Sequence, residues 1–140
     1  MIQLKIKKLN NKAIIPSYAK EGDACFDLTS TSMKQTDLYV EYGTGLAMEI
    51  PKGYVGLLFP RSSVTKKNLI LKNSVGVIDS GYRGEVKLRF YETEEWSDVY
   101  GIGDRVGQMM LVERPIVEFI EVEALENSDR SAGGFGSTGN

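Results

Sequence analysis

The sequence predicts an all-β domain of the sandwich, jelly-roll or barrel type. Short runs that alternate apolar and polar residues recur along the chain, which is the pattern of half-buried strands. Turn signals separate these runs, and the 140 residues include 15 glycines. Only one short stretch has helical character. Short strands at this spacing favour packed sheets or a barrel over a helical fold.

The expected elements follow this alternation in chain order. In the first strand, Ile2, Leu4 and Ile6 share one face, and polar residues occupy the other. The helical stretch is residues 62–71, where a serine can serve as N-cap. The other expected strands are residues 36–40, 46–50, 53–59, 85–91, 108–112 and 117–125.

The chain length is that of one ordinary domain. We expect residues 1–126 to form this β domain. Residues 127–140 are rich in glycine and serine and contain one aromatic residue. Such a segment cannot bury a core of its own, so we expect it to be a flexible C-terminal arm.

The composition excludes several kinds of chemistry. The chain has no histidine, so it has no Ser-His-Asp triad and no HExxH zinc site. Its single cysteine, Cys25, allows neither an internal disulfide nor a cysteine-rich metal cluster. The remaining catalytic groups are carboxylates, cations, hydroxyls, amides and an oxygen-preferring ion such as Mg²⁺.

Charge and hydropathy limit the partners and the location. A net charge of −2 disfavours stable binding to a nucleic-acid backbone. No run of about 18 apolar residues exists, so no membrane span is expected, and the first residues do not resemble a signal peptide. We expect a cytoplasmic location, or another reducing compartment.

Two segments offer groups that bind anions. Residues 60–63 (PRSS) close an apolar run and supply Arg61, Ser62 and Ser63 at a potential helix start. Residues 103–108 (GDRVGQ) supply a turn, a cation and the Gln108 amide. Taken singly, each has a plain structural alternative, an N-cap with a surface arginine in the first case and a charged hairpin loop in the second.

A third segment, residues 76–85 (GVIDSGYRGE), places a carboxylate and an aromatic ring around a turn. Asn73, just before it, has the donor and acceptor groups that read the edge of a base. Tyr82 can stack on a ring or a sugar. The structural alternative is a hairpin whose turn Asp79 stabilises.

Two further segments complete the set. Residues 130–139 (RSAGGFGSTG) are no Walker loop, but they place Arg130 and Phe135 among glycines, as an arm that closes over a phosphate and a base would need. Residues 23–28 (DACFDL) contain Asp27, which can orient a metal-bound water or simply point away from the core.

In this order, the five segments resemble the motif set of the trimeric dUTPases (deoxyuridine 5'-triphosphate nucleotidohydrolases). The similarity spans nearly the whole chain. The departures are modest, because Cys25, Ser63 and Ser131 stand where glycine is commoner in that family.

The resemblance implies a β-jelly-roll or β-clip domain that assembles as a homotrimer with active sites at the subunit interfaces. The implied reaction is hydrolysis of dUTP to dUMP and pyrophosphate, with Mg²⁺ on the phosphates. Such an enzyme limits uracil in DNA and supplies dUMP for dTMP synthesis.

The resemblance also implies residue roles. Asp79 is the general base that activates water, and Asp27 contacts the metal through water. Tyr82 excludes a ribose 2′-hydroxyl, and Phe135 of the arm covers the base. The uracil-binding residues are Asn73, Gly76, Val77 and Ile78. The phosphate-binding residues are Arg61, Ser62, Ser63, Gln108, Arg130, Gly136 and Ser137.

Two rival functions are weighed against this one. A dCTP deaminase has a related fold, but it carries a catalytic glutamate shortly after the third motif, where this chain has Arg89. A non-catalytic regulatory protein on the same fold is expected to lose Asp79, Asn73 or the arm, and all of these are present.

Overall fold

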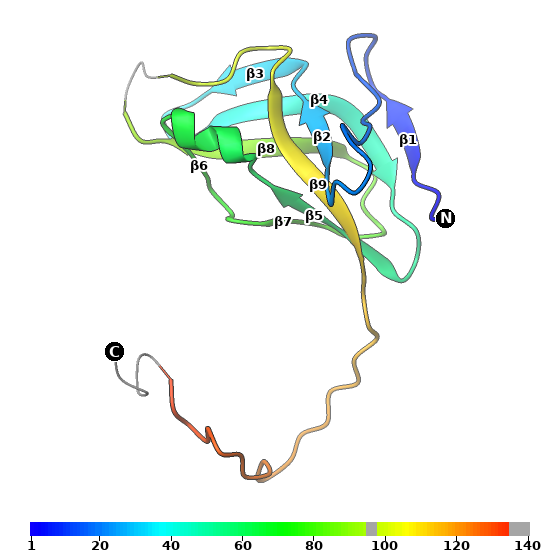
Figure 1. Ribbon diagram of the computed structural model, residues 1–140, viewed down its shortest axis with the longest axis vertical. Coiled ribbons are helices and arrows are strands. Elements are labelled where there is room, and N and C mark those ends of the chain that lie inside the picture. Colours follow the sequence, from blue (N-terminus) through cyan, green and yellow to red (C-terminus); the bar gives the residue numbers. More distant parts are fainter. Residues whose placement is uncertain (95–97, 135–140) are drawn as a thin grey trace.

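A computed structural model describes residues 1–94 and 98–134 of the chain. Two antiparallel sheets pack against each other, and a short 3-10 helix, η1 (Ser62–Lys66), lies beside them (Figure 1). The five-stranded sheet has the order β1-β4-β8-β6, and β3 also pairs with β4. The four-stranded sheet has the order β2-β9-β5-β7. The strands are β1 (Lys5–Lys8), β2 (Phe26–Thr29), β3 (Ser32–Gln35), β4 (Val40–Glu49), β5 (Tyr54–Phe59), β6 (Leu69–Leu71), β7 (Gly76–Ile78), β8 (Glu85–Glu92) and β9 (Arg105–Glu113).

The core lies between the two sheets and follows the alternation of the sequence. On β8, Val86, Leu88 and Phe90 are buried, while the residues between them face outward. Phe90 packs edge-on against Tyr42, with ring centroids 5.8 Å apart. Tyr42 is fully buried, and its hydroxyl donates a 3.0 Å hydrogen bond to the carbonyl of Tyr100. The prediction of an all-β jelly-roll domain is confirmed.

The expected strand at residues 36–40 is wrong except for its last residue. The hydroxyl oxygen of Thr36 accepts hydrogen bonds from the amides of Leu38 and Tyr39, and the Thr36 amide bonds to the Tyr39 carbonyl. These local bonds compete with a strand ladder and form a turn. Strand β4 therefore begins only at Val40.

The expected helix at residues 62–71 is shorter than predicted. It ends at Lys66 as a 3-10 turn, and Lys67 is already extended, with φ −124°. Val64 and Thr65 are β-branched, which disfavours a longer helix. Leu69 and Leu71 are buried on either side of exposed Ile70, so the rest of the stretch forms strand β6.

The expected strand at residues 117–125 is also wrong. Residues 114–134 leave the β domain after β9 and form no strand (Figure 1). Their apolar side chains stay in solvent, with Ile116 90% and Phe119 92% exposed. Alternation specifies a strand only when a neighbouring strand supplies the hydrogen bonds, and the described part of this chain offers this segment none.

Strands β3, β6 and β7 are four residues long or shorter, and the sequence pattern did not single them out. Within residues 1–94 and 98–134, no helix has both the length and the apolar character needed to cross a lipid bilayer.

Candidate active site

A carboxylate on β2 lies between two guanidinium groups from different parts of the chain. Arg61 Nε donates a 2.7 Å hydrogen bond to Asp27 Oδ1, and Arg105 Nη1 donates a 2.9 Å bond to Oδ2. The side chains of Asp27 and Arg61 are only 21% and 23% exposed. Charge-assisted pairs of this kind are short and orient the arginine fork. Two cations share one anion, so these three residues together carry one net positive charge.

The sheet register brings this cluster together. Asp27 on β2 pairs with Gln108 on β9, and Gln108 in turn pairs with Phe59, the last residue of β5. These residues therefore form one row across the four-stranded sheet. Strand β5 ends at this row. The chain then turns back, so that the Arg61 side chain reaches Asp27. Gln108 Nε2 holds that turn by donating a 3.0 Å hydrogen bond to the carbonyl of Pro60.

The serines after Arg61 lie at the same place. Arg61 Nη1 donates to Ser63 Oγ at 3.3 Å, and Ser63 Oγ lies 3.4 Å from the hydroxyl of Tyr100. Ser62 is the first residue of η1 and is exposed. A cavity of about 380 Å³ is lined by Asp27, Arg61, Ser62, Arg105 and Gln108, among others. We call these five residues with Ser63 the phosphate cluster.

The predicted base-binding residues meet at a second cavity, of about 680 Å³. Asn73, Val77, Ile78, Asp79 and Tyr82 are among the residues that line it. Gly76, the first residue of β7, is buried where the strand pairs with Leu58 of β5. Asp79 follows β7 and starts a tight turn, in which the Tyr82 amide donates to the Asp79 carbonyl at 3.0 Å. We call this place the nucleoside cavity.

The phosphate cluster and the nucleoside cavity are separate within one chain. Ile78 pairs with Gly56 of β5, whereas Gln108 pairs with Phe59 at the far end of that strand. About four residues of strand rise and two strand spacings separate Asp79 from Gln108, so their Cα atoms lie roughly 16 Å apart. A base must lie within about 3 Å of the proton that it accepts, or one water away. One chain therefore does not bring Asp79 to a phosphate held at Arg61.

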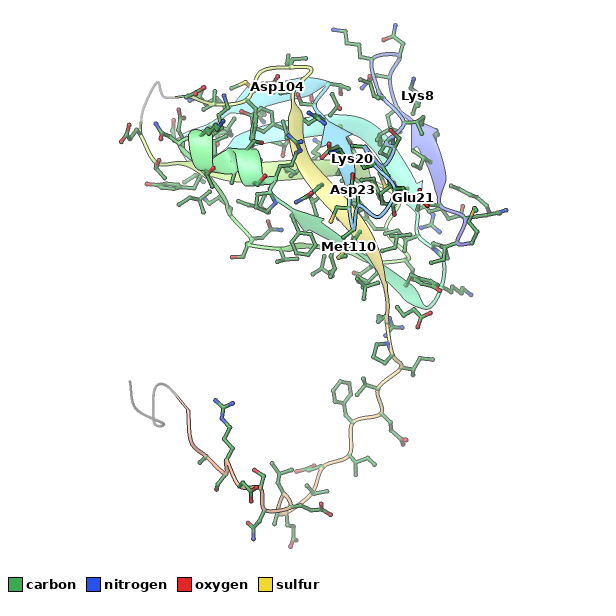
Figure 2. All side chains as sticks on the ribbon, viewed as in Figure 1. Lys8, Lys20, Glu21, Asp23, Asp104 and Met110 are labelled. Atoms are coloured by element: carbon green, nitrogen blue, oxygen red, sulfur yellow. The ribbon has the colours of Figure 1, made fainter. Side chains whose placement is uncertain are left out.

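Arg130, the one predicted arm residue that the structure describes, is remote from both places. Arg130 is exposed, and its Nε donates a 2.9 Å hydrogen bond to the carbonyl of Gly133, within the arm itself. Figure 2 shows that the side chains of the segment after β9 stand clear of the β domain. Phe135, Gly136 and Ser137 lie outside the described residues.

A row of charges on the outer face of the five-stranded sheet borders the nucleoside cavity. Glu41 of β4 accepts hydrogen bonds from Lys87 Nζ at 3.1 Å and from Arg89 Nε at 2.7 Å, both on β8. Burial by itself raises the pKa of Glu41, but the two cations outweigh burial and lower the pKa below its ordinary value. The guanidinium of Arg89 also lies over the ring of Tyr39, 4.5 Å from its centroid.

The comparison with known proteins agrees with this geometry. The dUTPase family model matches residues 11–139. The chain belongs to the dUTPase family. A deoxyuridine 5'-triphosphate nucleotidohydrolase of Nautilia profundicola is 39% identical over 145 residues, covering 99% of each chain. The resemblance of the five motifs is thus confirmed, and so is the prediction of an enzyme, a dUTP diphosphatase.

Solved dUTPase structures share the fold along most or all of the chain. The dUTPase of Staphylococcus bacteriophage 80alpha with dUPNHPP has a TM-score of 0.84 and 27% identity, covering 100% of both chains. A mutant dUTPase from phage phi11 of S. aureus, described with a structural Mg(II) ion, has a TM-score of 0.74 and 26% identity. That comparison covers 90% of this chain and all of the other.

Three residues of this dUTPase that the sequence reasoning did not assign take part in the arrangement. Arg105 was noted only as a cation in a turn, yet it completes the clamp on Asp27. Tyr100 contacts Ser63, and Glu85 bonds to the backbone of β4. Their partners are far away in sequence, so only the folded structure reveals them.

Proposed function

We propose that the chain hydrolyses dUTP to dUMP and pyrophosphate by attack of water on the α-phosphorus, with Asp79 as the general base. The carboxylate accepts a proton from the water, the new P–O bond forms, and the bond to the bridging oxygen breaks. Pyrophosphate leaves as an anion. The observation that carries the proposal is the convergence of Asn73, Asp79 and Tyr82 on one cavity, in a member of this family.

The phosphate cluster is proposed to bind the triphosphate. Arg61 and Arg105 supply positive charge, while Ser62, Ser63 and Gln108 supply donors. An ordinary aspartate is a weak base, so most of the rate must come from positioning and charge stabilisation. The ion pairs with Asp27 support this role, because a guanidinium already held in place loses little freedom when it binds a phosphate.

The nucleoside cavity is proposed to bind deoxyuridine. The Asn73 amide and the backbone of Gly76, Val77 and Ile78 offer donors and acceptors to the edge of uracil. A pocket closed around that edge has no space for the methyl group of thymine. Tyr82 is proposed to pack against the deoxyribose.

We infer that the active site is completed by other copies of the chain in a homotrimer. The roughly 16 Å between Asp79 and Gln108 supports this inference, because the two halves serve one substrate only if they come from different subunits. Residues 127–140 are proposed as an arm that closes over the site of a neighbouring subunit. There Arg130, Gly136 and Ser137 would contact phosphates and Phe135 the base.

Mg²⁺ is proposed as the metal, carried mainly by the substrate phosphates. Within residues 1–94 and 98–134, no three carboxylate or thiol groups lie together as a metal site. Both oxygens of Asp27 already accept from arginines. A carboxylate has about four acceptor sites, so Asp27 fits a role in which it accepts a hydrogen bond from a metal-bound water. When bound, Mg²⁺ neutralises charge on the phosphates.

Arg89 argues against a deaminase. A guanidinium stays protonated in proteins and cannot carry the proton that deamination requires. Here it is also paired with Glu41. We further propose that the enzyme works in the cytoplasm or another reducing compartment, where it supplies dUMP and keeps uracil out of DNA. The free cysteine Cys25 is consistent with this location.

The test is an assay of the purified full-length protein with Mg²⁺ and each of dUTP, UTP, dTTP and dCTP. We expect pyrophosphate from dUTP far above that from the other three. Release of ammonia from dCTP, or no pyrophosphate from dUTP, would overturn the proposal. Chelating Mg²⁺ is expected to suppress turnover.

A further inference from the structure

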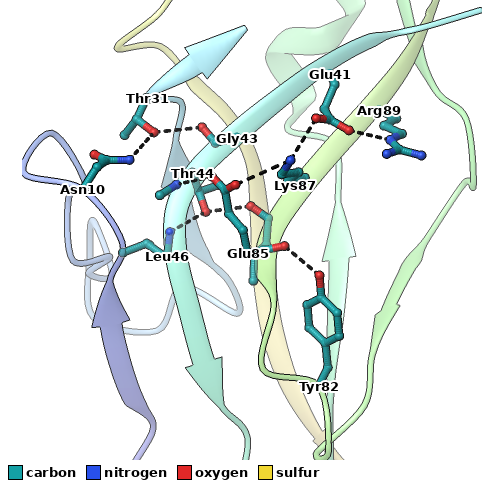
Figure 3. A network of polar contacts seen from close by, with 12 residues as sticks. Asn10, Thr31, Glu41, Gly43, Thr44, Leu46, Tyr82, Glu85, Lys87 and Arg89 are labelled. Atoms are coloured by element: carbon teal, nitrogen blue, oxygen red, sulfur yellow. Dashed lines mark hydrogen bonds and ion pairs between the residues drawn. The ribbon is translucent and has the colours of Figure 1, made fainter. Parts of the chain in front are cut away.

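We propose that Gly84 and Glu85 are positioning residues that hold the Tyr82 ring in place, and that they thereby set the discrimination between deoxyribose and ribose. The proposal rests on the dUTP hydrolysis proposed above and extends it to two residues outside the expected binding set. Figure 3 shows Tyr82 bonded to Glu85, beside strands β4 and β8.

The Tyr82 ring has two local attachments. Its hydroxyl donates a 3.0 Å hydrogen bond to the backbone carbonyl of Glu85. The ring also lies directly over Gly84, where an added Cβ would come within 2.6 Å of Cζ and 3.0 Å of Cε2. Carbon atoms in ordinary contact are about 3.5–4.0 Å apart, so any side chain at position 84 must displace the ring. Because Gly84 has no side chain, the Tyr82 ring can pack against its backbone. We call this contact surface at Gly84 the seat of the ring.

Glu85 connects the Tyr82 ring to strand β4 of the sheet. Its Oε1 accepts a 2.8 Å hydrogen bond from the amide of Gly45, where β4 has a bulge between Gly43 and Ala47 in its pairing with β8. Gly45 has φ +67°, a left-handed conformation that turns its amide out of the regular ladder. Lys87 Nζ lies 3.6 Å from the other carboxylate oxygen. The same residue thus binds Tyr82 through its carbonyl and β4 through its side chain.

This anchoring matters because Tyr82 is 45% exposed. An exposed side chain on a turn ordinarily changes rotamer within nanoseconds. A wall that excludes a single hydroxyl must stay in place, because a shift of about 1 Å is enough to spoil the fit of a substrate. Rigidity at this position therefore has to come from Gly84, which seats the ring, and from Glu85, which bonds to its hydroxyl and also lines the nucleoside cavity.

The experiment compares kcat/KM for UTP and dUTP in four variants of the full-length protein. Gly84→Ala displaces the ring. Glu85→Ala keeps the backbone carbonyl that accepts from Tyr82 but removes the carboxylate that holds this residue to the Gly45 amide. Glu85→Gln keeps an oxygen acceptor for the Gly45 amide and is the conservative rescue. Gly81→Ala is the matched control in the same turn, because a Cβ at Gly81 meets no atom within 4 Å. Thermal unfolding verifies that each variant is folded.

We expect Gly84→Ala and Glu85→Ala to raise the ratio of UTP to dUTP turnover by about 10-fold or more, because a pocket that rejects one added group discriminates by about 10²-fold. Glu85→Gln and Gly81→Ala should keep the wild-type ratio. The affinity for UMP relative to dUMP, measured by calorimetry, should rise in the first two variants as well. A general loss of stability would lower both activities and leave the ratio unchanged.

An unchanged ratio in folded Glu85→Ala and Gly84→Ala overturns the positioning role, while the preference of the wild type for dUTP still stands. A wild-type protein without that preference overturns the proposed function and this inference together. If Gly84→Ala does not fold, Tyr82→Phe tests the same idea, because it removes only the hydroxyl that bonds to Glu85. A wild-type ratio in Tyr82→Phe and Glu85→Ala then refutes the proposal.

Discussion

Arg61 and Asp27 form a 2.7 Å ion pair although 34 residues separate them in the sequence. The second oxygen of Asp27 is taken by Arg105, which approaches from β9. A single carboxylate thus orients two cations of the phosphate cluster. This arrangement gives Asp27 a role of its own, besides the contact with metal-bound water that the family resemblance implies.

Asp27→Asn tests which role dominates. An asparagine keeps the shape but removes the charge, and its NH₂ group then faces a guanidinium. We expect kcat/KM for dUTP to fall by about 10–100-fold, because misplaced arginines bind the phosphates less well. If orientation of the arginines is the main role, raising Mg²⁺ should not restore activity.

The control is Glu49→Gln, which removes the charge from the exposed Lys5–Glu49 pair of 2.9 Å. Exposed ion pairs contribute little, so this variant should resemble the wild type. Recovery of Asp27→Asn at high Mg²⁺ would contradict the orienting role and favour the metal contact.

Asp79→Asn is expected to bind nucleotide but to lose turnover. The amide keeps the size of the side chain and cannot accept the proton of the attacking water. The expected loss in kcat is on the order of 10²–10⁴-fold, the usual contribution of a general base. Calorimetry with a non-hydrolysable dUTP analogue checks that binding survives. Activity within about tenfold of the wild type would refute the assignment of Asp79 as the base.

The sequence predicted several of the strands, and the reason lies in their local patterns. The alternation of β8 and the apolar run of β5 need no partner to be recognised. Asn73, Asp79 and Tyr82 are near one another in the chain, so their meeting at one cavity was predictable from a single turn.

Long-range pairing could not be predicted in the same way. The alternation at residues 117–125 indicates a strand, but nothing local says whether a partner strand exists. Arg105 and Glu85 bond to residues far along the chain, through a register that no short window contains. At Thr36 the local bonds themselves overturn the prediction. The pattern predicts a strand, but the Thr36 hydroxyl accepts hydrogen bonds from two nearby amides and the segment forms a turn.

The exposed apolar segment after β9 leads to a prediction on assembly. Ile116, Phe119 and Leu125 are each more than 85% exposed, and large apolar groups in one segment usually mark an interface. We expect light scattering to give three times the mass of one chain. Phe119→Ser should weaken the assembly, whereas Ser128→Ala, farther along the same segment, should not. A stable and active monomer at micromolar concentration would contradict the trimer.

Glu41 leads to a prediction on pH. Its pKa in the folded protein lies below the ordinary 4.5, because the hydrogen bonds and charges of Arg89 and Lys87 outweigh burial. The unfolded chain therefore binds a proton at higher pH than the folded one. The stabilisation is complete above about pH 4.5 and is lost as the pH falls through the lower folded value.

Urea unfolding at several pH values measures this effect. Glu41→Gln should be less stable than the wild type at pH 7, and the difference should shrink in acid, where Glu41 is itself neutral. Glu21→Gln removes an exposed carboxylate and serves as the control for a change of net charge. If the free energies of unfolding of wild type and Glu41→Gln differed by the same amount at pH 7 and in acid, the ion-pair explanation would be contradicted.

The C-terminal arm gives the last prediction. All strands of the described chain end by Glu113, so ending the chain after Asn127 should leave the core intact. Ordering the arm costs backbone entropy. The two contacts proposed to offset this cost, stacking of Phe135 on a base and a charge-assisted bond from Arg130 to a phosphate, are both made to the substrate. Closure should therefore depend on the ligand. The truncated protein should keep the wild-type unfolding temperature and oligomeric state, bind the dUTP analogue, and hydrolyse dUTP much more slowly.

Arg130→Ala in the full-length chain should reproduce part of the loss. Full activity of the truncated protein would show that residues 128–140 are a linker without a catalytic role.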